Sequence, residues 1–96
     1  MNILVTYDIS TETKEGRRRL QKIATICKDY GQRVQNSVFE CTVNDLRMEQ
    51  MRTKLIKTIK KDEDNLRIYR LASDRQSCIE SHGIDKYIDF NKPIVI

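Results

Sequence analysis

A single carboxylate stands at the end of the first apolar stretch of the chain. Residues 3–10 read Ile-Leu-Val-Thr-Tyr-Asp-Ile-Ser, and the carboxylate belongs to Asp8. Burying a carboxylate costs free energy unless it is paired with a cation or coordinates one. Its oxygens are the hard ligands that Mg²⁺ and Mn²⁺ prefer. Two interpretations follow: Asp8 is a metal ligand, or it caps a helix or pairs with an arginine.

A metal held by one Asp8 would be bound weakly, through one carboxylate and several waters. A twofold axis beside Asp8 would bring a second copy and form a two-carboxylate site from one sequence position. The chain has 96 residues, and a domain of this size leaves roughly a third or more of its surface unburied. Oligomerisation is therefore a plausible source of further burial, and we expect a homodimer.

Arginines provide the second candidate chemistry. The segment 14–30 has a net charge of +4, from six basic and two acidic residues, whereas the rest of the chain is neutral. Arginine binds phosphate bidentately, and a localised basic face favours a polyanionic partner. The predicted nucleic-acid-binding residues are Arg17, Arg18, Arg19 and Arg33. The alternative is a solvated helix face with local salt bridges.

Other kinds of chemistry are not indicated. The cysteines, Cys27, Cys41 and Cys78, are odd in number and lack C-x-x-C spacing, which argues against a disulfide framework or a zinc site. Ser37 and the lone His82 form no nucleophile–base pattern. There is no Gly-rich phosphate loop, signal peptide or apolar run of about 18 residues. We expect a cytoplasmic protein with reduced thiols and no membrane partner.

Hydrophobic periodicity predicts the secondary structure. The predicted elements are a strand over 2–9, a helix over 14–30, a strand over 32–43 with a bulge or break near 36–37, a helix over 45–60, a strand over 66–71, one helical turn near 76–81 and a strand over 87–90. Gly31 is placed to end the first helix in a left-handed conformation. The apolar tripeptide 94–96 is expected to add a short strand to the edge of this sheet or of a partner's sheet.

This order predicts an α+β fold with a single domain over residues 1–96. The expected architecture is a ferredoxin-like βαββαβ sandwich with an additional C-terminal strand, in which two helices cover one face of an antiparallel sheet. The other face of the sheet also needs a cover. In a chain this short, we expect another subunit to provide it.

Two sequence features together point to a family. The Tyr7-Asp8-Ile9 strand end is followed by the arginine-rich helix and then by Gly-Gln-Arg-Val-Gln-Asn-Ser-Val-Phe-Glu-Cys over 31–41. Over essentially its whole length, the chain closely resembles the small CRISPR-associated protein of the adaptation module, the second of the two near-universal members. The resemblance implies a homodimer whose C-terminal strand, here 94–96, packs on the partner's sheet. It also implies a divalent metal, Mg²⁺ or alternatively Mn²⁺, between two Asp8 carboxylates.

The activity implied by this resemblance is metal-dependent cleavage of phosphodiesters in RNA or double-stranded DNA. Ser37 and Phe39 match the family motif directly and, with Tyr7 and Asp8, form the predicted catalytic set. The four arginines match the family's basic positions approximately. The family is also the non-catalytic centre of the spacer-integration complex, where its dimer bridges two dimers of the larger integrase and holds duplex DNA.

Two alternatives stay open beside the nuclease. One is a purely non-catalytic scaffold that bridges integrase dimers. The other is a ferredoxin-like module that binds a small regulatory ligand. The basic helix and the lack of Gly-rich loops argue against the second of these.

Overall fold

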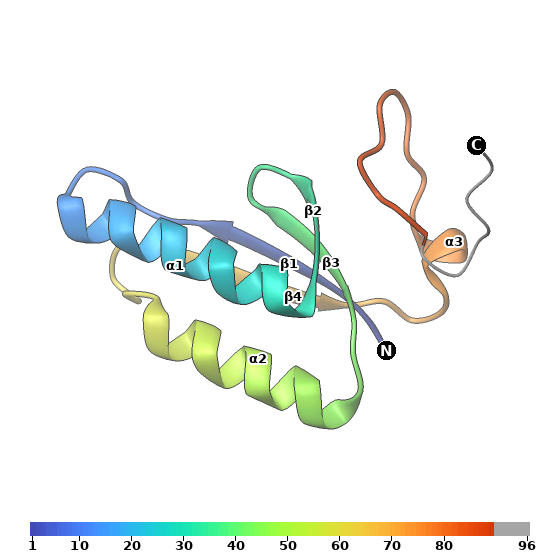
Figure 1. Cartoon of the computed structure of the whole chain (residues 1–96), viewed down its shortest axis with the longest axis horizontal. Coiled ribbons are helices and arrows are strands. Elements are labelled where there is room, and N and C mark those ends of the chain that lie inside the picture. The colour runs from blue at the N-terminus through green and yellow to red at the C-terminus, as the bar shows by residue number, and fades with distance from the viewer. Residues whose placement is uncertain (90–96) are drawn as a thin grey trace.

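The sheet has four antiparallel strands in the order β2-β3-β1-β4. The computed structural model describes residues 1–89. Its elements are β1 (Asn2–Asp8), α1 (Lys14–Tyr30), β2 (Gly31–Gln35), β3 (Val38–Thr42), α2 (Asp45–Thr58), β4 (Asn65–Arg70) and α3 (Arg75–Cys78). The two long helices cover one face of the sheet (Figure 1). This arrangement confirms the predicted ferredoxin-like α+β fold, while the predicted strand 94–96 lies outside the described residues.

Strand β1 is one of the two inner strands of the sheet, and the alternation of its side chains decides which face each candidate residue lies on. It pairs with β3 on one side and with β4 on the other, so that Val5 lies opposite both Phe39 and Ile68. Ile3, Val5 and Tyr7 are buried toward the helices. The alternate residues, among them Asp8, face away from the helices. The second face is half-buried and ends in the exposed Asp8.

The predicted second strand is a hairpin. Strands β2 and β3 pair antiparallel, and Asn36 and Ser37 form the turn between them. The predicted break near residues 36–37 is therefore confirmed, because the hairpin turn lies there. Gly31 is extended, with φ −164°, rather than left-handed. A glycine is needed there because a Cβ would overlap the Glu40 carbonyl oxygen.

Residues 71–89, which follow β4, fold against the sheet without adding a strand to it. The predicted helical turn is α3, but the prediction of a strand over 87–90 is wrong for residues 87–89, the part of that range that is described. The reason is that side chains satisfy the backbone here. Gln32 donates to the Ile88 carbonyl at 2.7 Å and accepts from the Ile88 amide at 2.9 Å. Asp85 accepts from the amide of Tyr87.

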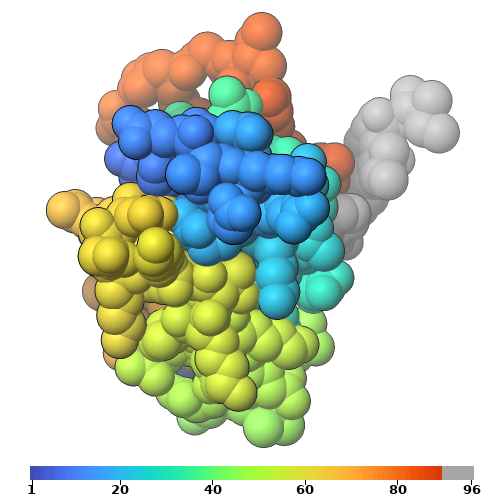
Figure 2. Space-filling view, turned by 90° about the vertical axis from the view of Figure 1, so that its left-hand side faces the viewer, coloured from blue at the N-terminus to red at the C-terminus, as the bar shows by residue number. Residues whose placement is uncertain are grey.

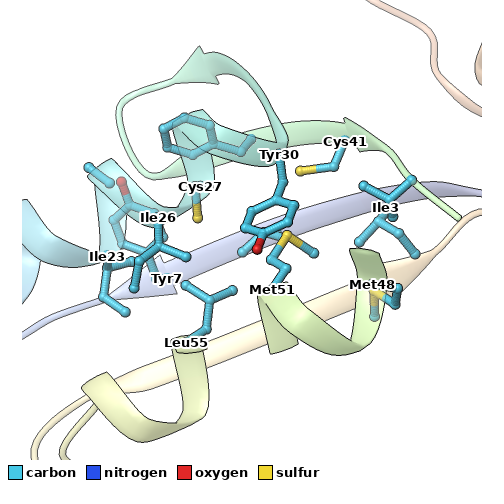
Figure 3. Close-up of a cluster of buried hydrophobic side chains, with 14 of the residues drawn as sticks. Ile3, Tyr7, Ile23, Ile26, Cys27, Tyr30, Cys41, Met48, Met51 and Leu55 are labelled. Atoms are coloured by element: carbon cyan, nitrogen blue, oxygen red, sulfur yellow. The ribbon is translucent and has the colours of Figure 1, made fainter. Parts of the chain in front are cut away.

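The core lies between the sheet and the two long helices. Figure 3 shows Ile23, Ile26 and Tyr30 of α1 close to Met51 and Leu55 of α2, in the layer between the helices and the sheet. These apolar side chains hold α1 and α2 on the sheet, and thereby fix the loops at its ends.

Two of the three cysteines are part of this core. Burial raises the pKa of Cys27 to about 12 and that of Cys41 to about 11. Both thiols are therefore protonated at neutral pH and serve as packing groups. Within residues 1–89, no helix combines the length and apolar character that crossing a bilayer requires.

Candidate functional site

Asp8 is the last residue of β1, and its side chain is exposed. It lies opposite Asn65 of β4 in the ladder. Among residues 1–89 its carboxylate forms no ion pair and no hydrogen bond. The cap of α1 is instead Thr13, whose hydroxyl accepts from the amide of Gly16 at 3.0 Å. Neither structural role considered for Asp8 is found in this part of the chain.

The loop after Asp8 is held in place by Asp64. One oxygen of this carboxylate, Oδ1, accepts from the amide of Ser10 at 3.1 Å, and Oδ2 accepts from the amide of Lys60 at 2.8 Å. Arg19 donates to the same carboxylate, whose side chain is fully buried. Burial alone would raise the pKa of Asp64, but the hydrogen bonds from Arg19, Lys60 and Ser10 outweigh it and lower the pKa below its ordinary value.

Sequence reasoning missed Asp64. It stands in the run Asp-Glu-Asp-Asn over 62–65, which reads as a polar turn. Nothing in the pattern distinguishes the acid that turns inward from its exposed neighbours. The loop after Asp8 also passes close to α1, and a glycine in the sequence marks this contact. Gly16 is a glycine in a helical turn, because a Cβ there would overlap the Ser10 carbonyl oxygen.

The three consecutive arginines of α1 do not form one patch. Successive residues of an α-helix point about 100° apart. Arg17 is exposed and donates to the Thr11 carbonyl at 3.1 Å. Arg18 is exposed and makes no ion pair within the described chain. Arg19 pairs with Asp64 and Glu63, and its side chain is only 15% exposed. Arg17 and Arg18 are therefore the two that remain open to a phosphate.

The other predicted site residues meet on the helix side of the sheet. The Tyr7 ring stacks on Phe39 with 6.3 Å between centroids, and the Arg33 guanidinium lies 5.2 Å from the Phe39 ring centre. The amide of Tyr7 donates to the Ser37 carbonyl at 3.1 Å. Its hydroxyl donates to the carbonyl of Asn36 at 3.4 Å. These contacts join the end of β1 to the β2–β3 turn.

The predicted catalytic set is consequently divided between two sides of the sheet. Tyr7 and Phe39 face the helices and are buried, whereas Asp8 faces the other way and is exposed. Adjacent residues of a strand point to opposite faces. Within one subunit the structure brings Tyr7, Ser37, Phe39 and Arg33 together and leaves Asp8 apart from them.

The face of the sheet that carries Asp8 is covered in part by the residues after β4. Arg75 forms an ion pair with Glu40 of β3, and its guanidinium lies 3.4 Å from the centre of the Tyr87 ring. Closer to Asp8, Arg67 donates to the hydroxyl of Tyr69 at 2.9 Å, and Tyr69 is 43% exposed. Among residues 1–89 no three potential metal ligands gather. Within residues 1–89, Asp8 offers this face a carboxylate that has no ion pair.

Comparison with known proteins identifies the family. A family model described as "CRISPR associated protein Cas2" matches residues 1–78. The chain is 50% identical over 96 residues to the CRISPR-associated endoribonuclease Cas2 1 of Moorella thermoacetica, with all of both chains covered. It is 41% identical over 95 residues to the CRISPR-associated endonuclease Cas2 of Halalkalibacterium halodurans, with 99% of each covered.

A solved structure gives the same result. The crystal structure of Streptococcus pyogenes Cas2 at pH 6.5 superposes with a TM-score of 0.76 and 46% identity, covering 86% of this chain and 100% of that one. The similarity thus extends to sequence and fold alike, and the resemblance seen in the sequence is confirmed. This chain belongs to the CRISPR-associated Cas2 family.

Proposed function

We propose that this chain is a Mg²⁺-dependent endonuclease of CRISPR adaptation that cleaves phosphodiesters of double-stranded DNA or RNA. The observation that carries the proposal is the exposed Asp8, whose carboxylate has no partner within residues 1–89. The relatives described above are named endoribonuclease and endonuclease, which supports the same reaction class.

The donor set fits Mg²⁺, with Mn²⁺ as an alternative. Mg²⁺ keeps several waters and is commonly bound in proteins through one or two carboxylates. Asp8 offers one such carboxylate, exposed and without an ion pair in the described chain. When bound, the metal would supply Lewis-acid activation of the phosphodiester and of a water molecule. The chain itself contributes the ligand oxygen and, through Asp64, the anchored loop that follows it.

A second copy of the chain would complete the site. Asp8 lies on the sheet face opposite the helices, and the exposed Tyr69 lies on the same face further along β4, opposite Leu4. A homodimer formed through this face would bury Tyr69 and place two Asp8 side chains near its axis. In such a dimer, the Asp8 carboxylates of the two chains would together be able to hold one divalent ion.

Arg17 and Arg18 are proposed to bind the nucleic-acid backbone. Both are exposed at the start of α1 and carry guanidinium groups without an ion pair among residues 1–89. Arginine pairs bidentately with phosphate oxygens and does so independently of base sequence. This role suits either DNA or RNA.

The experiment compares Asp8→Asn with a matched control, Asp62→Asn, which neutralises an exposed acid in the turn after α2. Cleavage of duplex DNA and of RNA is measured against Mg²⁺ and Mn²⁺ concentration, and the oligomeric state is measured by light scattering. We expect Asp8→Asn to abolish cleavage while the dimer persists, and Asp62→Asn to cleave normally. Undiminished cleavage by Asp8→Asn would place the activity elsewhere.

A second role, holding duplex DNA for the larger integrase, draws on a separate observation. Arg17 and Arg18 lie on α1, whereas Asp8 lies on the sheet face that points away from the helices. Duplex binding should therefore survive Asp8→Asn, and spacer acquisition should survive with it. Loss of acquisition in a variant that still binds duplex DNA and the integrase would show that cleavage is required.

A further inference from the structure

A hollow of about 580 Å³ lies between α1 and the β2–β3 turn, on the helix side of the sheet, and falls within the roughly 300–1,000 Å³ of small-molecule sites. Its walls come from three elements. Gln21, Thr25 and Lys28 are spaced along one face of α1, Arg33 comes from β2, and Tyr7 from β1. The hollow is thus built by parts of the chain that lie far apart in the sequence, and most of its lining side chains are exposed.

The charge in this hollow is positive and uncompensated. Lys28 and Arg33 both line it, and neither forms an ion pair with any residue in the described chain. No acidic side chain is among its lining residues. The Arg33 guanidinium is held over the Phe39 ring at 5.2 Å. Two cations from different elements, with no acid between them, favour an anionic ligand such as phosphate.

Uncharged polar groups surround the two cations. The side chains of Gln21, Asn36 and Ser37 line the hollow and make no hydrogen bond to another residue within 1–89. Tyr7 adds an aromatic wall whose ring position is fixed by its stacking on Phe39. An inorganic anion would use the cations alone. A ligand that also presents hydroxyl and amide-like groups would use the uncharged side chains as well.

We infer that this hollow binds a nucleoside monophosphate, with its phosphate between Lys28 and Arg33. The sugar and base lie against Gln21, Asn36 and Ser37. The site is separate from Asp8, which points to the opposite side of the sheet, and binding requires no metal. The phosphate monoester belongs either to a free nucleotide or to the phosphorylated end of a strand.

Calorimetric titration with AMP, adenosine and inorganic phosphate tests the site directly. We expect AMP to bind more tightly than either fragment. Lys28→Gln and Arg33→Gln should each weaken AMP binding about tenfold or more, because each removes a charge-assisted contact. The matched control is Lys22→Gln, which removes an exposed cation from α1 that lies outside the hollow. Equal weakening in this control would mean diffuse electrostatic attraction and would overturn the assignment.

Two further variants and a pair of oligonucleotides test the same assignment. Thr25→Phe narrows the hollow while keeping both cations, so it should weaken AMP binding and leave the circular dichroism spectrum unchanged. Asp8→Asn should leave AMP binding unchanged even if it abolishes cleavage. A short oligonucleotide with a 5′-phosphate, compared with its 5′-hydroxyl form, separates the two sources of the phosphate. If neither AMP nor the phosphorylated strand binds, the assignment is wrong.

Discussion

Arg19 and Asp64 are joined by two hydrogen bonds, from Nε to Oδ2 at 2.8 Å and from Nη2 to Oδ1 at 3.3 Å. The pair links α1 to the connection between α2 and β4. Figure 2 shows this junction from outside, where the blue start of α1 lies against the yellow end of α2. Because Asp64 also accepts from the amide of Ser10, the pair anchors the loop that follows Asp8.

The first prediction concerns the stability that this junction provides. Asp64→Ala should lower the free energy of unfolding by roughly 2–3 kcal/mol, because it leaves the Arg19 guanidinium and two backbone amides without their acceptor. The measurement is urea unfolding followed by circular dichroism. Asp62→Ala, an exposed acid two residues earlier, is the control and should unfold close to the wild type. Equal unfolding of both variants would contradict the anchoring role.

The second prediction concerns pH. The pKa of Asp64 is lowered in the folded state, so its contribution to stability is present above the ordinary pKa and is lost as pH falls through the lower folded value. The difference in unfolding free energy between wild type and Asp64→Asn should be constant from pH 7 to about 5 and shrink below about pH 4. Urea unfolding at several pH values measures this difference. A difference that persists unchanged into acid would mean that Asp64 has an ordinary pKa.

The third prediction separates the arginines of α1. Arg18→Gln should weaken duplex binding and reduce the salt slope by about one, because one phosphate contact is lost. Its unfolding should match that of the wild type. Arg19→Gln should instead destabilise the fold, since Arg19 is engaged by Asp64 and Glu63. Fluorescence anisotropy across a salt series, together with urea unfolding, tests both variants. Normal DNA binding by Arg18→Gln would make this part of α1 a merely solvated surface.

The sequence predicts a helix or strand well where its boundaries depend on residues within or next to it. The helix over 14–30 begins after the capping Thr13 and carries the apolar stripe that the core requires. The direction of Asp8 follows from strand alternation once Val5 is buried. In each case the prediction depends on nearby residues: a capping side chain, the spacing of apolar residues in a helix, or the alternation of side chains along a strand.

What could not be predicted depends on contacts between distant residues. The partner of Arg19 is 45 positions away in the sequence. The sequence does not show which of the three acids in the turn over 62–65 would pair with it. Residues 87–89 have a strand-like composition, yet the side chain of Gln32 occupies the backbone groups of Ile88 that a ladder would use. The hollow that Lys28 and Arg33 share likewise exists only when α1 and β2 are packed.

The last prediction concerns Tyr7, a member of the catalytic set that the sequence predicts. Its ring is buried against Phe39, and its hydroxyl makes one long hydrogen bond, 3.4 Å, to the carbonyl of Asn36. Tyr7→Phe keeps the ring and removes only the hydroxyl, so its unfolding free energy should fall by about 1 kcal/mol or less. Tyr7→Ala should cost roughly 3–5 kcal/mol because it leaves a cavity in the core.

The same variant decides whether the Tyr7 hydroxyl takes part in cleavage. Because Tyr7 and Asp8 point to opposite sides of the sheet, we expect Tyr7→Phe to cleave duplex DNA or RNA at the wild-type rate. The measurement is the single-turnover rate at saturating Mg²⁺, compared with the wild type and with Asp8→Asn, which the proposed function expects to be inactive. A large fall in that rate, with normal unfolding, would instead assign the hydroxyl a role at the reacting phosphate and require the two faces to meet in the assembled enzyme.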